Sequence, residues 1–162
     1  MRLDQSINNA MAMDDEAWAR HANPWSVWTR LATLPAFALA VYARVWIGWW
    51  CLIPIGLIVI FLWLNTRIFS KATTDERWET RAIRGEQLWL ARKENPIPEH
   101  HKTATFWIVF GSCVAIAPLA IGLVMLDPWA IALGVAGMLF GQLWFLDRLA
   151  WLYAETRNSE GK

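Results

Sequence analysis

Four long apolar runs, nearly free of charged residues, dominate the hydropathy pattern of the chain. They cover about residues 24–43, 46–65, 104–126 and 128–151. Because a helix needs about 20 apolar residues to cross a hydrocarbon core of ~30 Å, each run is long enough to span a membrane. The sequence therefore predicts an all-α fold, an integral membrane four-helix bundle built from two transmembrane hairpins.

Capping residues mark the start of two of these helices. Asn23 suits an N-cap and Pro24 the first helical position, because proline lacks the N–H that a helix start leaves unpaired. Asp127 and Pro128 repeat this arrangement and predict a tight turn inside the second hairpin. The two hairpins could be a duplication, since "LNTR" and "LDR" end their second helices, or they could be unrelated.

The charged segment between the hairpins has helical periodicity over about residues 73–94. Thr73 and Glu76 fit a capping box. One face of this predicted helix carries small and aromatic residues, namely Trp78, Ala82, Gly85 and Trp89. Such a helix either lies in the membrane interface among anionic headgroups or packs on the end of the bundle. We favour the interfacial amphipathic helix.

The distribution of charge predicts the topology. Residues 1–22 form an acidic segment without the apolar core of a signal peptide, so we expect the first apolar run to be a true span. Residues 23–154 form the membrane domain and residues 155–162 a polar tail. Of the 15 lysines and arginines, only Arg44 falls on the far side of a four-span arrangement. The positive-inside rule then places both termini in the cytoplasm of a multi-pass protein in the bacterial inner membrane.

Composition supports the same class. The chain is 56% hydrophobic and contains 13 tryptophans, ten of which fall near the two expected membrane interfaces. Cys51 and Cys113 lie within spans and are interpreted as apolar fillers. The expected partners are the lipid bilayer, anionic lipid headgroups, and a second copy or another membrane protein. Nothing in the sequence indicates nucleic-acid binding.

Polar residues gather at the cytoplasmic ends of the predicted spans. Asn65 and Arg67 end the second span, Asp147 and Arg148 lie at the same level in the fourth, and Arg30 lies near it in the first. A carboxylate at this depth needs a partner. We therefore predict an ion pair of Asp147 with Arg30 or Arg67 that holds the hairpins together. The alternative is a headgroup or substrate site.

Three histidines share this side of the predicted topology. His21 precedes the first span, and His100 and His101 precede the third, so all three could meet near Asp147 and Glu86. Imidazoles and carboxylates are suitable ligands for Zn²⁺, Fe or Mn. The candidate metal ligands are His21, His100, His101 and Asp147. No HExxH or Glu-x-x-His spacing is present, no cofactor is required by the sequence, and solvated loop histidines are the simpler interpretation.

The span interiors argue against proton-coupled transport, because their central stretches contain no ionisable side chain. Gln142, an amide within the fourth span, is expected to bind another helix. A stripe of small residues in the same span, Gly134, Gly137 and Gly141, predicts close helix packing within the bundle or in a homodimer. No Gly-x-Ser-x-Gly or phosphate-binding loop is present, so no catalytic residue is assigned.

Several motifs resemble a family of small prokaryotic integral membrane proteins of unknown function. They are "HANPWSVWTR" at 21–30, "LNTRIF" at 64–69, "RGEQLW" at 84–89, "HH" at 100–101 and "WFLDRLAWLY" at 144–153. The resemblance covers about residues 20–153 and implies a membrane protein without an assigned activity. In that family the second motif typically has proline where this chain has Thr66. The matching polar positions are His21, Asn23, Arg30, Asn65, Arg67, Glu86, His100, His101, Asp147 and Arg148.

These patterns lead to three ranked functional hypotheses. We expect a non-enzymatic assembly, scaffold or accessory membrane protein, because no specific catalytic constellation is present. The alternative is a metal-binding protein or lipid-headgroup enzyme with a cytoplasmic-face site of histidines and carboxylates. A small transporter comes third, because the spans lack buried ionisable groups.

Overall fold

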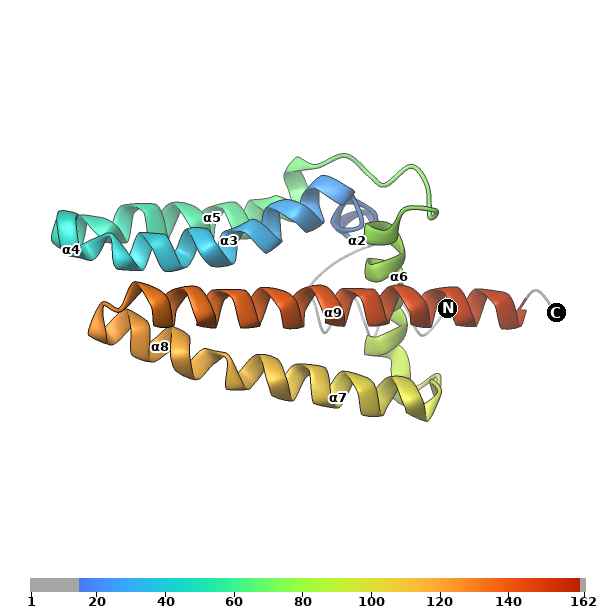
Figure 1. Ribbon diagram of the computed structural model, residues 1–162. Coiled ribbons are helices and arrows are strands. Elements are labelled where there is room, and N and C mark those ends of the chain that lie inside the picture. The colour runs from blue at the N-terminus through green and yellow to red at the C-terminus, as the bar shows by residue number, and fades with distance from the viewer. Residues whose placement is uncertain (1–14, 161–162) are drawn as a thin grey trace.

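The computed structural model describes residues 15–160, which form helices joined by short connections and no strand (Figure 1). The all-α prediction is confirmed. The elements in order are α2 (Asp15–His21), α3 (Pro24–Tyr42), α4 (Arg44–Ile47), η1 (Gly48–Cys51), α5 (Leu52–Ile68), α6 (Trp78–Leu90), η2 (Ala91–Lys93), α7 (Glu99–Val114), α8 (Ile116–Met125) and α9 (Pro128–Glu160).

Two helical hairpins run side by side, and a cross-helix closes one end. The first hairpin pairs α3 with α5, and the second pairs the consecutive helices α7 and α8 with the long α9 (Figure 1). The hairpin turns lie at one end of the bundle. At the other end lie α2 and α6, and α6 crosses α9 steeply (Figure 1). We call this second end the α6 end.

The N-cap predicted for the first hairpin is confirmed. The Asn23 side chain accepts a hydrogen bond from the backbone N–H of Trp25, 2.9 Å away, and Pro24 is the first helical residue. The chain reverses through α4 and η1, where Gly48 has φ 55° and ψ −133°. A side chain is strained in this conformation, so glycine permits the reversal.

The turn of the second hairpin also has the predicted cap. Leu126 ends α8 in the left-handed conformation, and Asp127 Oδ1 accepts from the N–H of Trp129 at 2.9 Å. Arg44 from the first hairpin donates to the carbonyls of Leu123 and Val124 at the end of α8. A cation that caps carbonyls at a helix C-terminus is favourable, so Arg44 links the two hairpins at this end.

The small-residue stripe of α9 faces helices of its own hairpin. A Cβ added at Gly134 would lie 2.4 Å from the backbone nitrogen of Leu119 in α8. At Gly137 and Gly141 it would meet the side chains of Ala115 and Ser112. Within the chain this stripe therefore lets α9 approach α7 and α8 closely.

The cross-helix begins later than the sequence predicted. It starts at Trp78, not near Thr73, and the predicted capping box does not form. Instead the Oγ1 of Thr74 accepts from the N–H of Glu76, 3.2 Å away. The reason lies upstream, where Ala72 N–H donates to Ala19 O of α2 at 2.9 Å. This backbone pairing holds the connector against α2 and keeps it out of the helix.

Helix α6 packs into the bundle, so its small face does not contact headgroups. Its buried residues include Ala82, Ile83 and Gly85, and a Cβ added at Gly85 would lie 1.9 Å from the carbonyl oxygen of Leu149 in α9. The expectation that Ala82 and Gly85 face the membrane interface is therefore wrong. The small and aromatic residues on this face of α6 suggested contact with lipid. Small residues are equally suited to a close crossing between two helices.

The hydrophobic core lies at the α6 end, while the hairpins expose apolar side chains along most of their length. Trp18, Val27, Ile83 and Leu146 belong to one buried cluster at the α6 end. Three helical stretches of the described chain are long and apolar enough to cross a membrane, Pro24–Ile68, Glu99–Met125 and Pro128–Ser159. Only 6, 11 and 17% of the residues in their most apolar windows are buried. The first stretch contains the reversal at Gly48, so it comprises the antiparallel pair α3 and α5.

Candidate functional site

The polar residues that the sequence grouped at one boundary occupy separate places in the structure. Arg30 lies in a partly buried network with His21 and Glu86. Asn65 joins α5 to α3, and His100 and His101 lie together at the start of α7. Arg30 also lines a cavity of about 500 Å³, so the Arg30 network forms the candidate site.

The Arg30 network joins three helices. Nη1 of Arg30 in α3 lies 2.5 Å from Nε2 and 2.9 Å from Nδ1 of His21 in α2. Oε2 of Glu86 in α6 lies 3.7 Å from Nε2 of His21. Nε of Arg30 donates to the carbonyl of Ser26 at 3.1 Å. Arginine can only donate, so the contact favours a neutral His21 ring that accepts. Trp18 packs edge-on against that ring, with centroids 5.5 Å apart.

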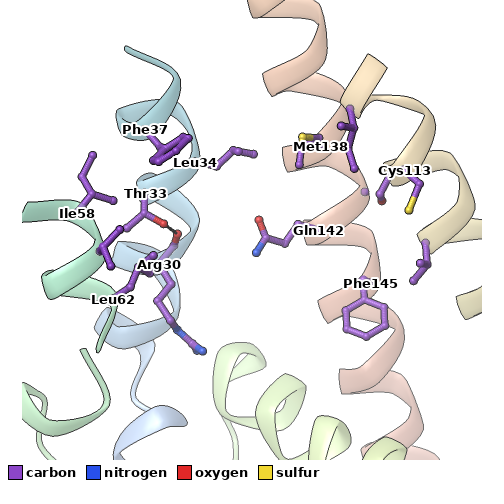
Figure 2. A pocket seen from close by; sticks show the side chains of 15 residues that line it. Arg30, Thr33, Leu34, Phe37, Ile58, Leu62, Cys113, Met138, Gln142 and Phe145 are labelled. Atoms are coloured by element: carbon purple, nitrogen blue, oxygen red, sulfur yellow. Dashed lines mark hydrogen bonds between the residues drawn. The ribbon is translucent and has the colours of Figure 1, made fainter. Parts of the chain in front are cut away.

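A cleft of about 500 Å³ separates the two hairpins and ends at Arg30 (Figure 2). Its walls come from α3 and α5 on one side and from α7, α8 and α9 on the other, and most of its lining is apolar. Arg30 extends from α3 toward α6, and Gln142 points into the cleft from α9 (Figure 2). Representative apolar lining residues are Leu34, Phe37, Ile58, Leu62, Met138 and Phe145.

The polar end of the cleft continues into a smaller cavity. This cavity, of about 260 Å³, is also lined by Arg30, Thr33 and Gln142, and it adds Glu86 and residues of the core.

Gln142 makes no side-chain hydrogen bond among the described residues, so the expectation that it binds another helix is wrong. One end of the cleft thus presents a guanidinium and an amide, and most of the remaining lining is apolar. The carboxylate of Glu86 lines only the smaller cavity.

Asn65 pairs the helices of the first hairpin. Its side chain is fully buried, accepts from Oγ of Ser26 at 2.5 Å and donates to Oγ1 of Thr29 at 2.9 Å. Asn23 extends this contact by donating to the carbonyl of Ser70, 3.0 Å away. Asn23 and Asn65 were both candidate site residues. In the structure, Asn65 binds α3 and Asn23 binds the segment that follows α5.

Asp147 does not form the predicted ion pair. Its Oδ1 accepts from the indole Nε1 of Trp78, 2.9 Å away, and no ion pair of Asp147 occurs among the described residues. Arg30 is directed to His21 instead, and Arg67 stacks on Trp63 with its guanidinium carbon 4.0 Å from the ring centre. The crossing position of α6 explains the difference, because it brings Trp78 to Asp147.

The candidate metal ligands are divided between three places. His21 is in the Arg30 network and Asp147 is on Trp78, while His100 and His101 lie against Glu155. Glu155 was not among the residues predicted from the sequence, because residues 155–162 were expected to form a polar tail, whereas α9 continues to Glu160. The signal was the spacing in α9, since Trp151 and Glu155 follow Asp147 at intervals of one helical turn. Arg148 donates to the carbonyl of His100 at 3.0 Å.

A family of unknown function, DUF6653, matches residues 2–162. The chain belongs to DUF6653. The match agrees with the resemblance to a family of unknown function and extends it from about residues 20–153 to nearly the whole chain. No curated protein and no solved structure matches the chain. Membership supplies no activity, substrate or topology, so the function of this DUF6653 protein has to be inferred from its own residues.

Acidification is expected to destabilise this DUF6653 protein through His21. Burial, and then the charge of Arg30, lower the pKa of His21 below its ordinary value of 6.5, while Glu86 partly opposes the shift. Well above pH 6.5 the imidazole is neutral in the folded and unfolded chains. Below it the unfolded chain binds a proton that the folded chain excludes, so stability falls until the pH reaches the lowered pKa.

Unfolding in detergent micelles between pH 7.5 and 5.5 measures this contribution. The His21→Gln variant, whose amide can still accept from Arg30, should show a shallower loss of stability than wild type. The difference in slope is at most about 1.4 kcal/mol per pH unit, the limit for one proton. Identical pH profiles of the two proteins would contradict the buried, neutral His21.

Proposed function

We propose that this protein is a four-span membrane protein that holds a phospholipid-like amphiphile, with apolar chains and an anionic headgroup, in the cleft between its hairpins. The observation that carries the proposal is the shape and lining of the cleft. It is apolar over most of its length and has Arg30 at one end. The protein would bind this molecule without transforming it.

The surface of the hairpins supports the four-span arrangement. The turn end carries several strongly exposed tryptophans, which are Trp46, Trp49, Trp50 and Trp129. Aromatic residues favour the level of the headgroups, and the exposed aliphatic residues between the two ends suit hydrocarbon. Among residues 15–160, Arg44 is the one basic residue at the turn end. The positive-inside rule therefore favours the α6 end, with the beginning of α2 and the end of α9, on the cytoplasmic side of the inner membrane.

The bilayer favours occupation of the cleft by apolar chains. Water in a cleft lined by Leu34, Phe37, Ile58 and Met138 would find few polar partners, whereas lipid chains at the same depth enter without crossing water. A volume of about 500 Å³ is in the range of small-molecule sites. An acyl chain is therefore the occupant that fits the apolar part best.

Arg30 supplies the recognition of an anionic headgroup. Its guanidinium has five N–H donors, and the hydrogen bonds to Ser26 and His21 leave donors for a ligand. Guanidinium groups bind phosphate and carboxylate in a bidentate manner, and this interaction is strong at a partly dehydrated site. Gln142 adds an amide on the opposite wall.

The groups lining the cleft favour binding over a reaction. The hydroxyl of Ser112 donates to the carbonyl of Ile108 at 2.8 Å, so it is committed to its own helix. No histidine or carboxylate beside Ser112 or Cys113 lines the described cleft to activate a nucleophile. The expected assembly, scaffold or accessory role stays a prediction, and a bound amphiphile is compatible with it.

Native mass spectrometry of protein released gently from membranes tests the proposal. Wild type should retain one amphiphile per chain. Met138→Trp should fill the cleft and reduce the retained fraction about tenfold, since overpacking costs on the order of 1–3 kcal/mol. Leu133→Trp is the matched control, because Leu133 is 66% exposed on the same helix and does not line the cleft. It should retain the amphiphile.

Two results would overturn the proposal. One is a wild-type chain that carries no amphiphile, either as a bare monomer or as a dimer whose second copy fills the cleft. The other is equal retention by the Met138→Trp and Leu133→Trp variants, which would assign the bound lipid to the outer surface.

A further inference from the structure

The side chains of His100, His101 and Glu155 converge on one point at the α6 end of the bundle. The histidines lie in the first turn of α7, and Glu155 lies near the end of α9. Nε2 of His100 and Nε2 of His101 are 3.3 and 3.1 Å from the same carboxylate oxygen, Oε2 of Glu155. The three donor atoms all lie within 4.8 Å of one another.

These separations fit the edges of a metal-coordination polyhedron. Zinc binds imidazole nitrogen and carboxylate oxygen at about 2.0–2.2 Å, so the ligand atoms of a tetrahedral site lie about 3.3–3.5 Å apart. Both separations from Glu155 Oε2 are close to this range before any adjustment. Two imidazoles and one carboxylate are also a donor set that binds first-row transition metals well.

The surroundings hold the three donors in place. His101 is 1% exposed, and its ring lies 4.3 Å from that of His100, measured between centroids. Trp151, one turn before Glu155 in α9, packs edge-on against His101 at 5.9 Å. Arg148 donates to the carbonyl of His100 and covers the outer face of Trp151. This packing limits how far the imidazoles can turn away from Glu155.

The charges around the cluster are compatible with a cation. The carboxylate of Glu155 offsets the nearby guanidinium of Arg148, and both imidazoles bind metal in their neutral form. His100 and Glu155 are partly exposed, so an ion can enter from solvent and keep a water in the remaining position. Without an ion, the same geometry lets each imidazole donate a hydrogen bond to Glu155, and the experiment must separate these two states.

We propose that His100, His101 and Glu155 bind a divalent transition-metal ion of the Zn²⁺ class, with a fourth position open to water. The ion would join the start of α7 to the end of α9 at the α6 end of the bundle. This site involves none of the residues that line the cleft, so it stands independently of the amphiphile proposal.

Metal binding to the full-length, tag-free chain in detergent tests the site. After treatment with a chelator, the protein is titrated with Zn²⁺ by calorimetry and with Co²⁺ by visible absorption, which reports tetrahedral coordination. Wild type should bind one ion. His100→Ala and Glu155→Gln, which change partly exposed side chains, should each weaken binding at least about tenfold. His21→Gln and Asp147→Asn should bind like wild type, because the structure places both residues elsewhere.

Either of two results would overturn the metal site. One is wild-type affinity for Zn²⁺ no tighter than that of Glu155→Gln, which would assign the cluster to hydrogen bonding alone. The other is stoichiometric binding that survives His100→Ala and Glu155→Gln but is lost in His21→Gln or Asp147→Asn, which would place the ion elsewhere. Circular dichroism of each variant confirms that its helices are intact.

Discussion

Replacing Gly85 by valine is expected to displace α6 from α9 and to lower the free energy of unfolding by about 3 kcal/mol. A Cβ at this position would lie 1.9 Å from the carbonyl oxygen of Leu149 and 2.5 Å from its carbonyl carbon. Both atoms are backbone, so no side chain can rotate away to relieve the overlap. The helices must separate, and Ala82 and Ile83 would then lose their buried contacts.

Gly56→Val is the control for this prediction. Gly56 is also a glycine inside a helix, but no atom lies within 4 Å of a Cβ added there. The two variants are compared by denaturant unfolding in the same micelles. Gly56→Val should unfold near the wild-type midpoint and Gly85→Val far below it. Similar stabilities of the two variants would show that α6 does not cross α9 as closely as described.

Asn65→Leu is expected to destabilise the first hairpin by about 2–3 kcal/mol, although leucine has nearly the same size. The substitution leaves the buried hydroxyl of Ser26 facing an apolar group, while Thr29 keeps its hydrogen bond to the carbonyl of Trp25. Buried polar groups that lose their partner cost their full desolvation energy. The measurement is again the free energy of unfolding in micelles.

A double-mutant cycle with Ser26→Ala isolates the hydrogen bond. Once Ser26 has no hydroxyl to leave unpaired, Asn65→Leu should cost less by about 1 kcal/mol, because replacing both partners by apolar groups is much milder than replacing one. Additive effects in the cycle would contradict a direct bond between Asn65 and Ser26.

Local signals in the sequence predicted the hairpins well. The caps at Asn23 and Asp127 depend on residues within a few positions of one another, so their effect does not depend on the rest of the fold. The apolar runs likewise indicated where helices form, but the second run was predicted to be helical from residue 46 and α5 begins at Leu52, because the chain reverses through α4 and η1. The start of α6 was predicted less well because Ala72 pairs with Ala19, a contact between segments far apart in the chain.

The sequence indicated which residues belong to the candidate site, but it did not indicate which of them contact one another. The sequence placed Arg30, His21 and Glu86 at one level, but the partner of each depends on where α6 crosses the bundle. Trp78 reaches Asp147 only because of that crossing. Glu155 was missed because the apolar pattern ends before the helix does. The cleft itself depends on the spacing between two hairpins, which no pattern within either hairpin specifies.

Photo-crosslinking inside native membranes tests whether the cleft selects an anionic amphiphile from the bilayer. A benzoyl-phenylalanine in place of Met138 faces the cleft, and one in place of Leu133 faces outward on the same helix. Position 138 should capture one lipid class with an anionic headgroup, while position 133 should capture lipids in their bulk proportions. Capture of bulk lipid, of a second copy or of α3 by position 138 would contradict a cleft that selects its amphiphile.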